Sequence, residues 1–88
     1  MAVEYDPHKA AANAIKHGVT FEEATSALLD PMALVKEDVF AESESRWILL
    51  GMSAAGRLLV VVYTIRGDET VHIISARQAS RNESAAYA

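Results

Sequence analysis

The sequence contains no cysteine and no long apolar run, and both absences narrow what the protein can be. Without cysteine the chain has no disulfide bond, no thiolate nucleophile and no cysteine-based zinc site. No apolar stretch approaches the roughly 18 residues of a membrane-spanning helix, and the N-terminus lacks the basic and then apolar pattern of a secretory signal. We therefore expect a soluble, cytoplasmic protein that makes no membrane contact.

The chain is also short, with 88 residues. Two separate hydrophobic cores would each belong to a unit of about 40 residues, a size at which chains usually need disulfides, metals or a partner. The sequence has no internal repeat, low-complexity tract or linker that would divide it. Residues 1–88 are therefore expected to form a single domain.

Positive charge is scarce, so that the net charge is −4, and it is unevenly distributed along the chain. Residues 1–45 hold all three lysines against nine acidic residues, whereas residues 46–81 hold all five arginines against two acidic residues. The overall negative charge argues against a simple nucleic-acid binder, because phosphate neutralisation supplies most non-specific affinity. The arginine-bearing half could form a face for a polyanion, or it could be ordinary solvated surface.

Proline and glycine are few, and they mark where the N-terminal half changes structure. Residues 1–5 alternate in the manner of a short strand. Pro7, preceded by an aspartate that can act as a cap, is typical of a helix start, and Gly18 is typical of a helix end. Ala11 and Ile15 are spaced to form the buried stripe of this helix.

A second helix is predicted by a capping box at Thr20 and Glu23. In such a box the threonine oxygen accepts a hydrogen bond from the Glu23 amide, and the glutamate side chain returns to the Thr20 amide. The helix is expected to stop before Pro31, because proline disfavours helical geometry at the residue before it.

The C-terminal half favours β-structure. Residues 46–53, 57–65 and 70–75 are apolar and rich in β-branched side chains, and only short turns separate them, which predicts an antiparallel meander. Residues 32–35 could add a brief strand, and the acidic residues 36–45 indicate a surface loop. The middle segment has the fewest polar residues and is expected to be the central strand, covered on one face by helices.

A second capping box, formed by Ser80 and Glu83, predicts a short C-terminal helix that reaches Tyr87. The expected order is therefore β-α-α, then an antiparallel β-meander, then a short helix. This order indicates an α+β fold in which the helices form a layer on the sheet.

A series of short motifs runs in a fixed order through nearly the whole chain. In the N-terminal half these are YDPHKA at 5–10, KHGV at 16–19, FEEA at 21–24 and DP at 30–31. In the C-terminal half they are GRLLVV at 56–61, YT at 63–64 and IISAR at 73–77. Each motif is weak alone, but their order and spacing are specific, and the sequence resembles the BrnT family of toxins from type II toxin–antitoxin systems.

The resemblance implies a fold akin to RelE and the microbial ribonucleases, so that the expected fold class is α+β and RelE/BrnT-like. It also implies an endoribonuclease whose RNA cleavage inhibits translation. The implied partners are an RNA substrate and a BrnA-like antitoxin that folds over the toxin. Because that antitoxin represses its own operon, contact with DNA would be only indirect.

The sequence departs from the family pattern in two places. Family members commonly have arginine before the IISAR motif, where this chain has His72. Their C-terminal helix is usually basic, whereas residues 82–88 contain no cation. Fewer cations on this helix would weaken the attraction of RNA.

RNA cleavage without metal requires a base for the 2′-hydroxyl proton, an acid for the leaving oxygen, and cations around the phosphorane between them. Arginine suits the last task because its guanidinium binds two phosphate oxygens and stays charged. The candidates at or just beyond predicted strand ends, with the first two favoured, are Arg77, Arg57, Arg46 and Arg66. Any one of them could instead be a solvated charge or an antitoxin contact.

His72 is the candidate for proton transfer. It lies between Val71 and Ile73 in a predicted strand, so it points away from the face that those two occupy. If they face the helices, the imidazole lies on the open face, where it could act as acid or base. It could equally be a structural histidine, and a register slip of one residue would bury it.

Further residues are candidates for binding RNA. Lys9 could reach a phosphate, Tyr5 could stack on an unpaired base, and Arg81 adds a cation to the last helix. Trp47 could also stack, although packing is the more common role of tryptophan. The histidines lack metal-ligand spacing, so we expect no metal and no cofactor.

Two functions of different classes therefore remain open. One is a metal-independent endoribonuclease that acts by 2′-hydroxyl attack, with arginines on the phosphate and His72 carrying a proton. The other is a catalytically weak or silent module that holds its antitoxin in a repressor complex. The retained arginines favour the enzyme, whereas the cation-poor C-terminal helix favours the silent module.

Overall fold

Five strands of the described part of the chain form one sheet, and the three apolar segments of the C-terminal half are its centre. In the computed structural model, which describes residues 1–67 and 69–87, β3 (Trp47–Met52), β4 (Leu58–Arg66) and β5 (Thr70–Gln78) form the predicted antiparallel meander. β2 (Leu34–Glu37) pairs antiparallel with β3, and β1 (Ala2–Glu4) pairs parallel with β5. The order across the sheet is β1-β5-β4-β3-β2, with β4 at its centre as expected. Asp68 of the predicted β4–β5 turn, and Ala88, lie outside the described residues.

The helices that accompany the sheet among the described residues are α1 (Pro7–His17), α2 (Phe21–Leu28) and α3 (Arg81–Tyr87). The Asp6 side chain caps α1 by accepting a hydrogen bond from the His8 amide at 2.8 Å, as the sequence predicts. No helix within residues 1–67 and 69–87 combines the length and the apolar character needed to cross a membrane.

The C-terminal capping box is complete. Ser80 Oγ accepts from the Glu83 amide at 3.2 Å, and Glu83 Oε1 accepts from the Ser80 amide at 2.7 Å. Both exposed amides at the start of α3 are thereby satisfied, as the sequence predicts.

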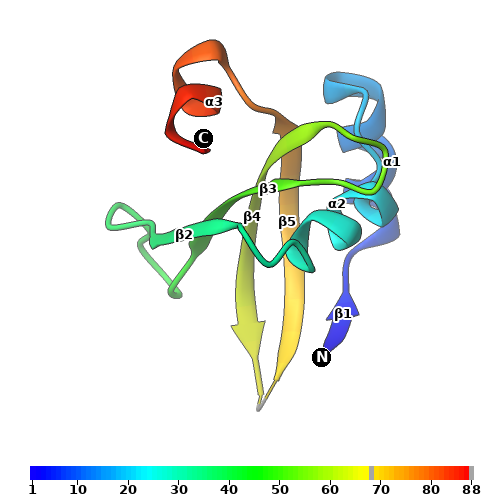
Figure 1. Ribbon diagram of the computed structural model, residues 1–88. Helices are drawn as coiled ribbons and strands as arrows, with labels where there is room; N and C mark the ends of the chain where they lie inside the picture. Colours follow the sequence, from blue (N-terminus) through cyan, green and yellow to red (C-terminus); the bar gives the residue numbers. More distant parts are fainter. Residues whose placement is uncertain (68, 88) are drawn as a thin grey trace.

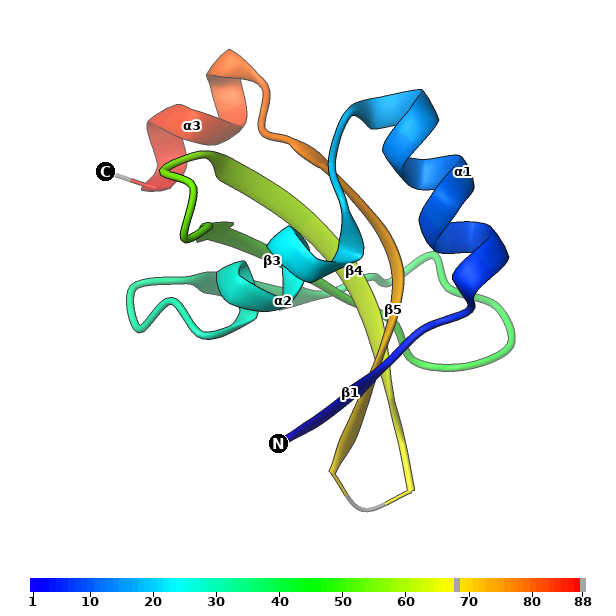
Figure 2. The same ribbon diagram turned by 90° about the vertical axis from the view of Figure 1, so that its right-hand side faces the viewer.

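The helices α1 and α2 cover one face of the sheet, while α3 lies at the end of the opposite face (Figures 1 and 2). The core lies beneath α1 and α2, where Phe21 of α2 packs with Leu59, Val61 and Ile73 of the sheet. Burying side chains of this size contributes roughly 1.5–3 kcal/mol each. The uncovered remainder of the second face, which we call the open face, is where catalytic side chains can be displayed beside a rigid sheet.

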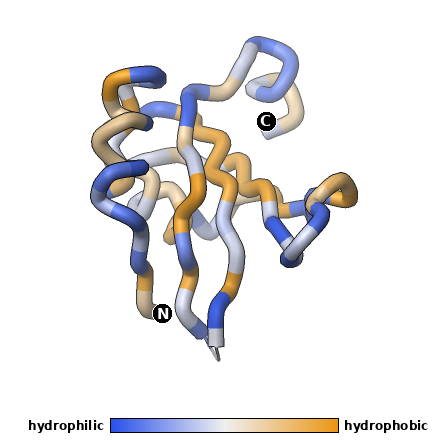
Figure 3. Tube along the Cα trace, turned by 180° about the vertical axis from the view of Figure 1, so that it is seen from behind, coloured by the Kyte–Doolittle hydropathy of each residue, from blue (hydrophilic) through white to orange (hydrophobic). Residues whose placement is uncertain are grey.

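An irregularity in β5 decides which of its side chains reach the open face. Val62 pairs with Ser75 and Tyr63 pairs with Ile73, so that Ile74 is an extra residue without a partner on β4. Such a bulge resets the alternation of side chains along a strand. As a result Ile73 and Ala76 are both buried in the core, although three positions separate them. Figure 3 shows the apolar residues that run along the central strands.

The rotation of α1 differs from the prediction. Ala11 and Ile15 are exposed, and the side that faces the sheet carries Ala10 and Asn13. Asn13 Nδ2 donates to the carbonyl oxygens of Val19 and Ala76, and its Oδ1 accepts from the Ala76 amide. These three buried hydrogen bonds fix the face that α1 presents to β5, because unmet buried polar groups are costly.

We therefore expect Asn13→Ala to lower the free energy of unfolding by about 2–4 kcal/mol, since it leaves buried backbone groups of Ala76 and Val19 without partners. The control is Lys16→Ala, at an exposed position of the same helix. Urea unfolding of both variants measures the difference. Equal midpoints for the two variants would show that the side chain of Asn13 does not hold α1 on the sheet.

Candidate active site

Three neighbouring strands, with the segment directly before a fourth strand, align polar side chains in one row across the open face. The parallel pairing of β1 with β5 places Glu4 beside His72, and the antiparallel pairing with β4 places Thr64 on the other side of His72. Continuing the register of β3 and β4 beyond Trp47 places Arg46 next to Thr64. Because neighbouring strands lie about 4.8 Å apart, the row extends over roughly 14 Å.

His72 is at the centre of this row and points to the open face, because Val71 and Ile73 are buried in the core on the other side. Its Nδ1 lies 3.3 Å from Glu4 Oε1. The side chain of His72 is 13% exposed and that of Glu4 is 50% exposed. A ring nitrogen that faces a carboxylate fixes the orientation of the imidazole and leaves Nε2 for another partner.

Thr64 is buried, and its hydroxyl connects the row to the segment before β3. Thr64 Oγ1 donates to the Ser45 carbonyl oxygen at 2.8 Å. This bond fixes the end of the loop between β2 and β3, and Arg46 is the next residue. Thr64 therefore positions the backbone of the arginine rather than presenting a group for chemistry.

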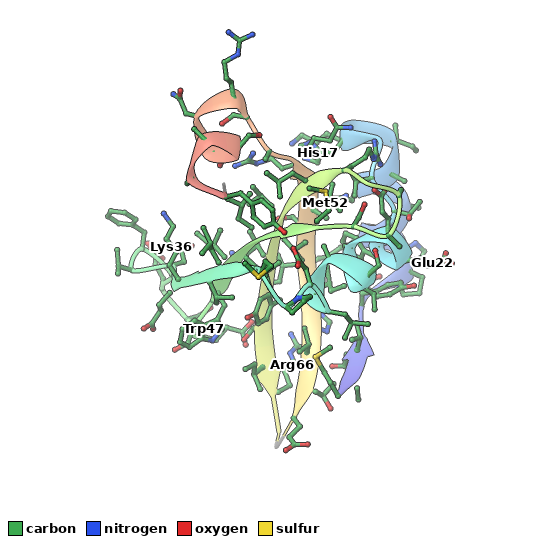
Figure 4. The ribbon with its side chains drawn as sticks, viewed as in Figure 1. His17, Glu22, Lys36, Trp47, Met52 and Arg66 are labelled. Carbon is green, nitrogen blue, oxygen red and sulfur yellow. The ribbon has the colours of Figure 1, made fainter. Side chains whose placement is uncertain are left out.

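Arg66 lies on the same face as Thr64, two residues further along β4, at a distance of about 7 Å along the strand. Figure 4 shows Arg66 towards the end of β4 that leads into the β4–β5 turn. Its Nη2 is 3.9 Å from Glu44 Oε1, and both side chains are exposed, so this ion pair is weak. Arg66 is therefore free to bind an anion near His72.

Arg57 lies elsewhere, in a network between the β3–β4 turn and the α1–α2 turn. Its Nε donates to Glu23 Oε2 at 2.9 Å and its Nη2 donates to the Gly18 carbonyl oxygen at 3.0 Å, while a second contact joins Nη2 to Glu23 Oε1. Glu23 Oε2 also accepts from the Ser53 hydroxyl at 2.7 Å. Arg57 lies seven positions before Thr64, which corresponds to roughly 24 Å along an extended strand.

The network corrects the predicted first capping box. Thr20 Oγ1 accepts from the Glu23 amide at 3.0 Å as expected. The carboxylate of Glu23, however, bonds Arg57 and Ser53 instead of returning to the Thr20 amide. The Arg57 guanidinium lowers the pKa of Glu23, and the pKa of Arg57 is raised in turn. A bidentate arginine partner outcompetes the weaker bond to a backbone amide.

Arg77 lies on the open face, at the end of β5 far from His72. Its Nη1 and Nη2 donate to the two carboxylate oxygens of Glu83 at 2.8 and 2.7 Å. The Arg77 guanidinium, with help from the Ser80 amide, lowers the pKa of Glu83 to about 2. A phosphate at Arg77 would therefore compete with a carboxylate that already occupies the guanidinium.

The three residues expected to bind RNA do not gather at the row. The ring of Tyr5 packs edge-on against Phe21, with the ring centroids 5.2 Å apart. Lys9 is exposed on α1, on the other side of the sheet, and Arg81 is exposed at the start of α3. Trp47 is half-buried and pairs with Tyr63, which packs against the core, so its position suits packing.

The structure thus brings together three of the five predicted catalytic residues, His72, Arg46 and Arg66, and separates Arg57 and Arg77 from them. Sequence reasoning missed Glu4, since no local pattern shows that β1 pairs with β5. Within residues 1–67 and 69–87, no three histidine and acidic side chains are clustered so that they could hold a metal ion.

Comparison with known proteins identifies the family. The model of a family described as "Ribonuclease toxin, BrnT, of type II toxin-antitoxin system" matches residues 5–83. The chain belongs to the BrnT family. Membership makes an antitoxin its implied partner. No curated protein matches the sequence.

A solved BrnT structure supports the same conclusion. The crystal structure of the Brucella abortus ribonuclease toxin BrnT superposes with a TM-score of 0.71 at 25% sequence identity, covering 92% of this chain and 99% of that chain. The α+β fold expected from the sequence resemblance is therefore that of a BrnT toxin.

The pair of Arg77 and Glu83 makes stability depend on acid pH. The pKa of Glu83 is about 2 in the fold, against an ordinary value of 4.5, so its contribution is present above the ordinary pKa and is lost as the pH falls from about 5 towards 2. We expect Glu83→Gln to flatten the loss of unfolding free energy across this window. The exposed control Glu22→Gln should keep the parent's slope in urea titrations. If the unfolding free energy of Glu83→Gln falls with pH as steeply as that of the parent, the pair of Arg77 and Glu83 is not the source of this pH dependence.

Proposed function

We propose that this BrnT-family protein is a metal-independent endoribonuclease that cleaves RNA by attack of the 2′-hydroxyl. As the toxin of a type II system it inhibits translation in the cytoplasm until a BrnA-like antitoxin binds it. The observation that carries the proposal is the row on the open face, where His72 has a carboxylate partner in Glu4 and Arg46 and Arg66 lie nearby.

His72 is the base in this proposal. With Nδ1 directed at Glu4, its Nε2 accepts the proton of the 2′-hydroxyl. The O2′–P bond forms as the P–O5′ bond breaks, and the leaving 5′-oxygen takes a proton from water. The products are a 2′,3′-cyclic phosphate and a 5′-hydroxyl end.

Arg46 and Arg66 stabilise the phosphorane. Arg46 is the register neighbour of Thr64 and Arg66 follows Thr64 by two residues on β4. Guanidinium groups bind the equatorial oxygens of a phosphorane through charge-assisted hydrogen bonds. Arg77 and Arg81 bind RNA further from the reacting bond, whereas Lys9 lies on the other side of the sheet and is not part of this binding path. Arg57 maintains the fold through Glu23 and has no part in the chemistry.

A second function is favoured by the ion pairs inside the chain. Arg57 and Arg77 are each held by a glutamate, and the net charge is −4. A chain with these arginines neutralised would attract RNA weakly and would act chiefly by holding its antitoxin in a repressor complex.

The test is cleavage of a structured RNA by the purified chain with a chelator present. We expect His72→Ala and Arg46→Ala each to reduce the rate by about a hundredfold or more, because each removes a group from the reacting centre. Lys16→Ala, exposed on the opposite side of the sheet, is the matched control and should cleave at the parent's rate. Mass analysis of the ends should find the cyclic phosphate.

Two results decide against the proposal. If folded His72→Ala cleaves RNA at the parent's rate, the open-face row has no part in the mechanism. If Arg77→Ala is the only variant that loses about a hundredfold in cleavage rate, the site lies at the other end of β5. A folded parent that leaves RNA intact while binding its antitoxin would establish the silent module instead.

A further inference from the structure

The strand β2 is an edge of the sheet, and its outer side pairs with no other strand among the described residues. An unpaired edge presents backbone N–H and C=O groups that can form hydrogen bonds to an added strand. All four residues of β2 are exposed, and two of them, Leu34 and Val35, are aliphatic side chains about half exposed. The edge is therefore both open and partly apolar.

Exposed apolar side chains gather around this edge. Of the ten large apolar side chains that are exposed in the described residues, seven form what we call the β2 patch: Leu29, Met32, Leu34, Val35, Val39, Phe40 and Met52. Several exposed large apolar side chains in one part of a surface mark an interaction site more often than isolated ones do. Figure 4 shows Met52, a member of the patch, on β3 and Lys36 on β2.

On the open face the patch continues into an apolar groove between the sheet and α3, with a volume of about 230 Å³. Its lining contains the charged side chains of Lys36 and Glu83 and is otherwise aliphatic: Leu34, Val35, Ile48, Leu50, Val60 and Ala86. The Tyr87 hydroxyl donates to Asp30 and so keeps α3 in place as one wall. A groove of this size accepts one or two aliphatic side chains.

Negative charge borders the patch. Glu37, Asp38, Glu42 and Glu44 lie on and directly after β2, and no cation occurs between Lys36 and Arg46. Figure 3 shows this loop as mainly hydrophilic with an apolar tip. RNA would be repelled here, and a second copy of the chain would bring the same carboxylates against them. The surface is complementary to a cationic partner.

We propose that an extended, cationic segment of the antitoxin pairs with β2 as a sixth strand. Its backbone bonds to the free edge, an aliphatic side chain enters the groove under α3, and an arginine or lysine meets the acidic residues that follow β2. This proposal rests on the antitoxin that the BrnT family implies, and it is independent of the catalytic assignment.

The test measures the affinity of the chain for the purified antitoxin encoded beside the toxin gene. Val35→Lys should raise Kd at least tenfold, because it replaces an apolar edge side chain by a cation that repels the partner. The matched control is Ile65→Lys, since Ile65 is 51% exposed and Val35 is 50% exposed. It should leave Kd within twofold of the parent.

A second matched pair guards against misfolding. Phe40 and Ile15 are both 88% exposed, so replacing either by serine leaves the core intact. Phe40→Ser should raise Kd about fivefold and Ile15→Ser should not change it. Hydrogen exchange should show new protection of the β2 amides in the complex.

Unchanged Kd in both patch variants overturns the proposal. Hydrogen-exchange protection of the β1 edge in place of the β2 edge would also overturn it. A dimer of the free chain that Val35→Lys abolishes would do the same, because a second copy of the chain would then occupy the edge. RNA cleavage by free Val35→Lys should match the parent. If the parent does not cleave RNA, the catalytic proposal is refuted, but the comparison of Kd values for the antitoxin still tests the β2 proposal.

Discussion

In the pairing of β4 with β5, one extra residue sets which side chains reach each face of the sheet. Ile74 has no partner on β4, and the side-chain alternation therefore resets between Ile73 and Ala76, both of which enter the core. His72 and Arg77 consequently share the open face, although five positions separate them and a regular strand would direct them to opposite faces. The core beneath α1 and α2 and the polar row on the open face both depend on this bulge.

Some arginines of the chain stabilise the fold and others lie at the proposed site, a difference that the net charge of −4 does not reveal. Arg57 and Arg77 are held by glutamates at one end of the sheet, while Arg46 belongs to the row of His72 and Arg66 lies beside it. The acidic loop after β2 ends at Ser45, whose carbonyl oxygen accepts from Thr64 in that row. An antitoxin segment bound along β2 and the loop would therefore lie at the border of the proposed catalytic site and would neutralise it by covering the approach of RNA.

Local signals in the sequence predicted what local interactions decide. The capping box at Glu83, the meander and the outward direction of His72 follow from short-range chemistry and strand alternation. The same reasoning was wrong for Ile15, because long-range hydrogen bonds set the rotation of α1, and for the return bond of Glu23, because an arginine 34 positions later binds its carboxylate. The partnership of Glu4 with His72 depends on a parallel pairing of distant strands, which no local pattern encodes.

The most direct test of the open-face site is an NMR titration of the labelled chain with a short RNA that carries 2′-O-methyl groups and so cannot be cleaved by this route. We expect chemical-shift changes centred on His72, Arg46 and Arg66, with the Nε resonance of Arg57 unchanged because Glu23 holds that guanidinium. Changes confined to α3 and Arg77, or to the face covered by α1 and α2, would contradict it.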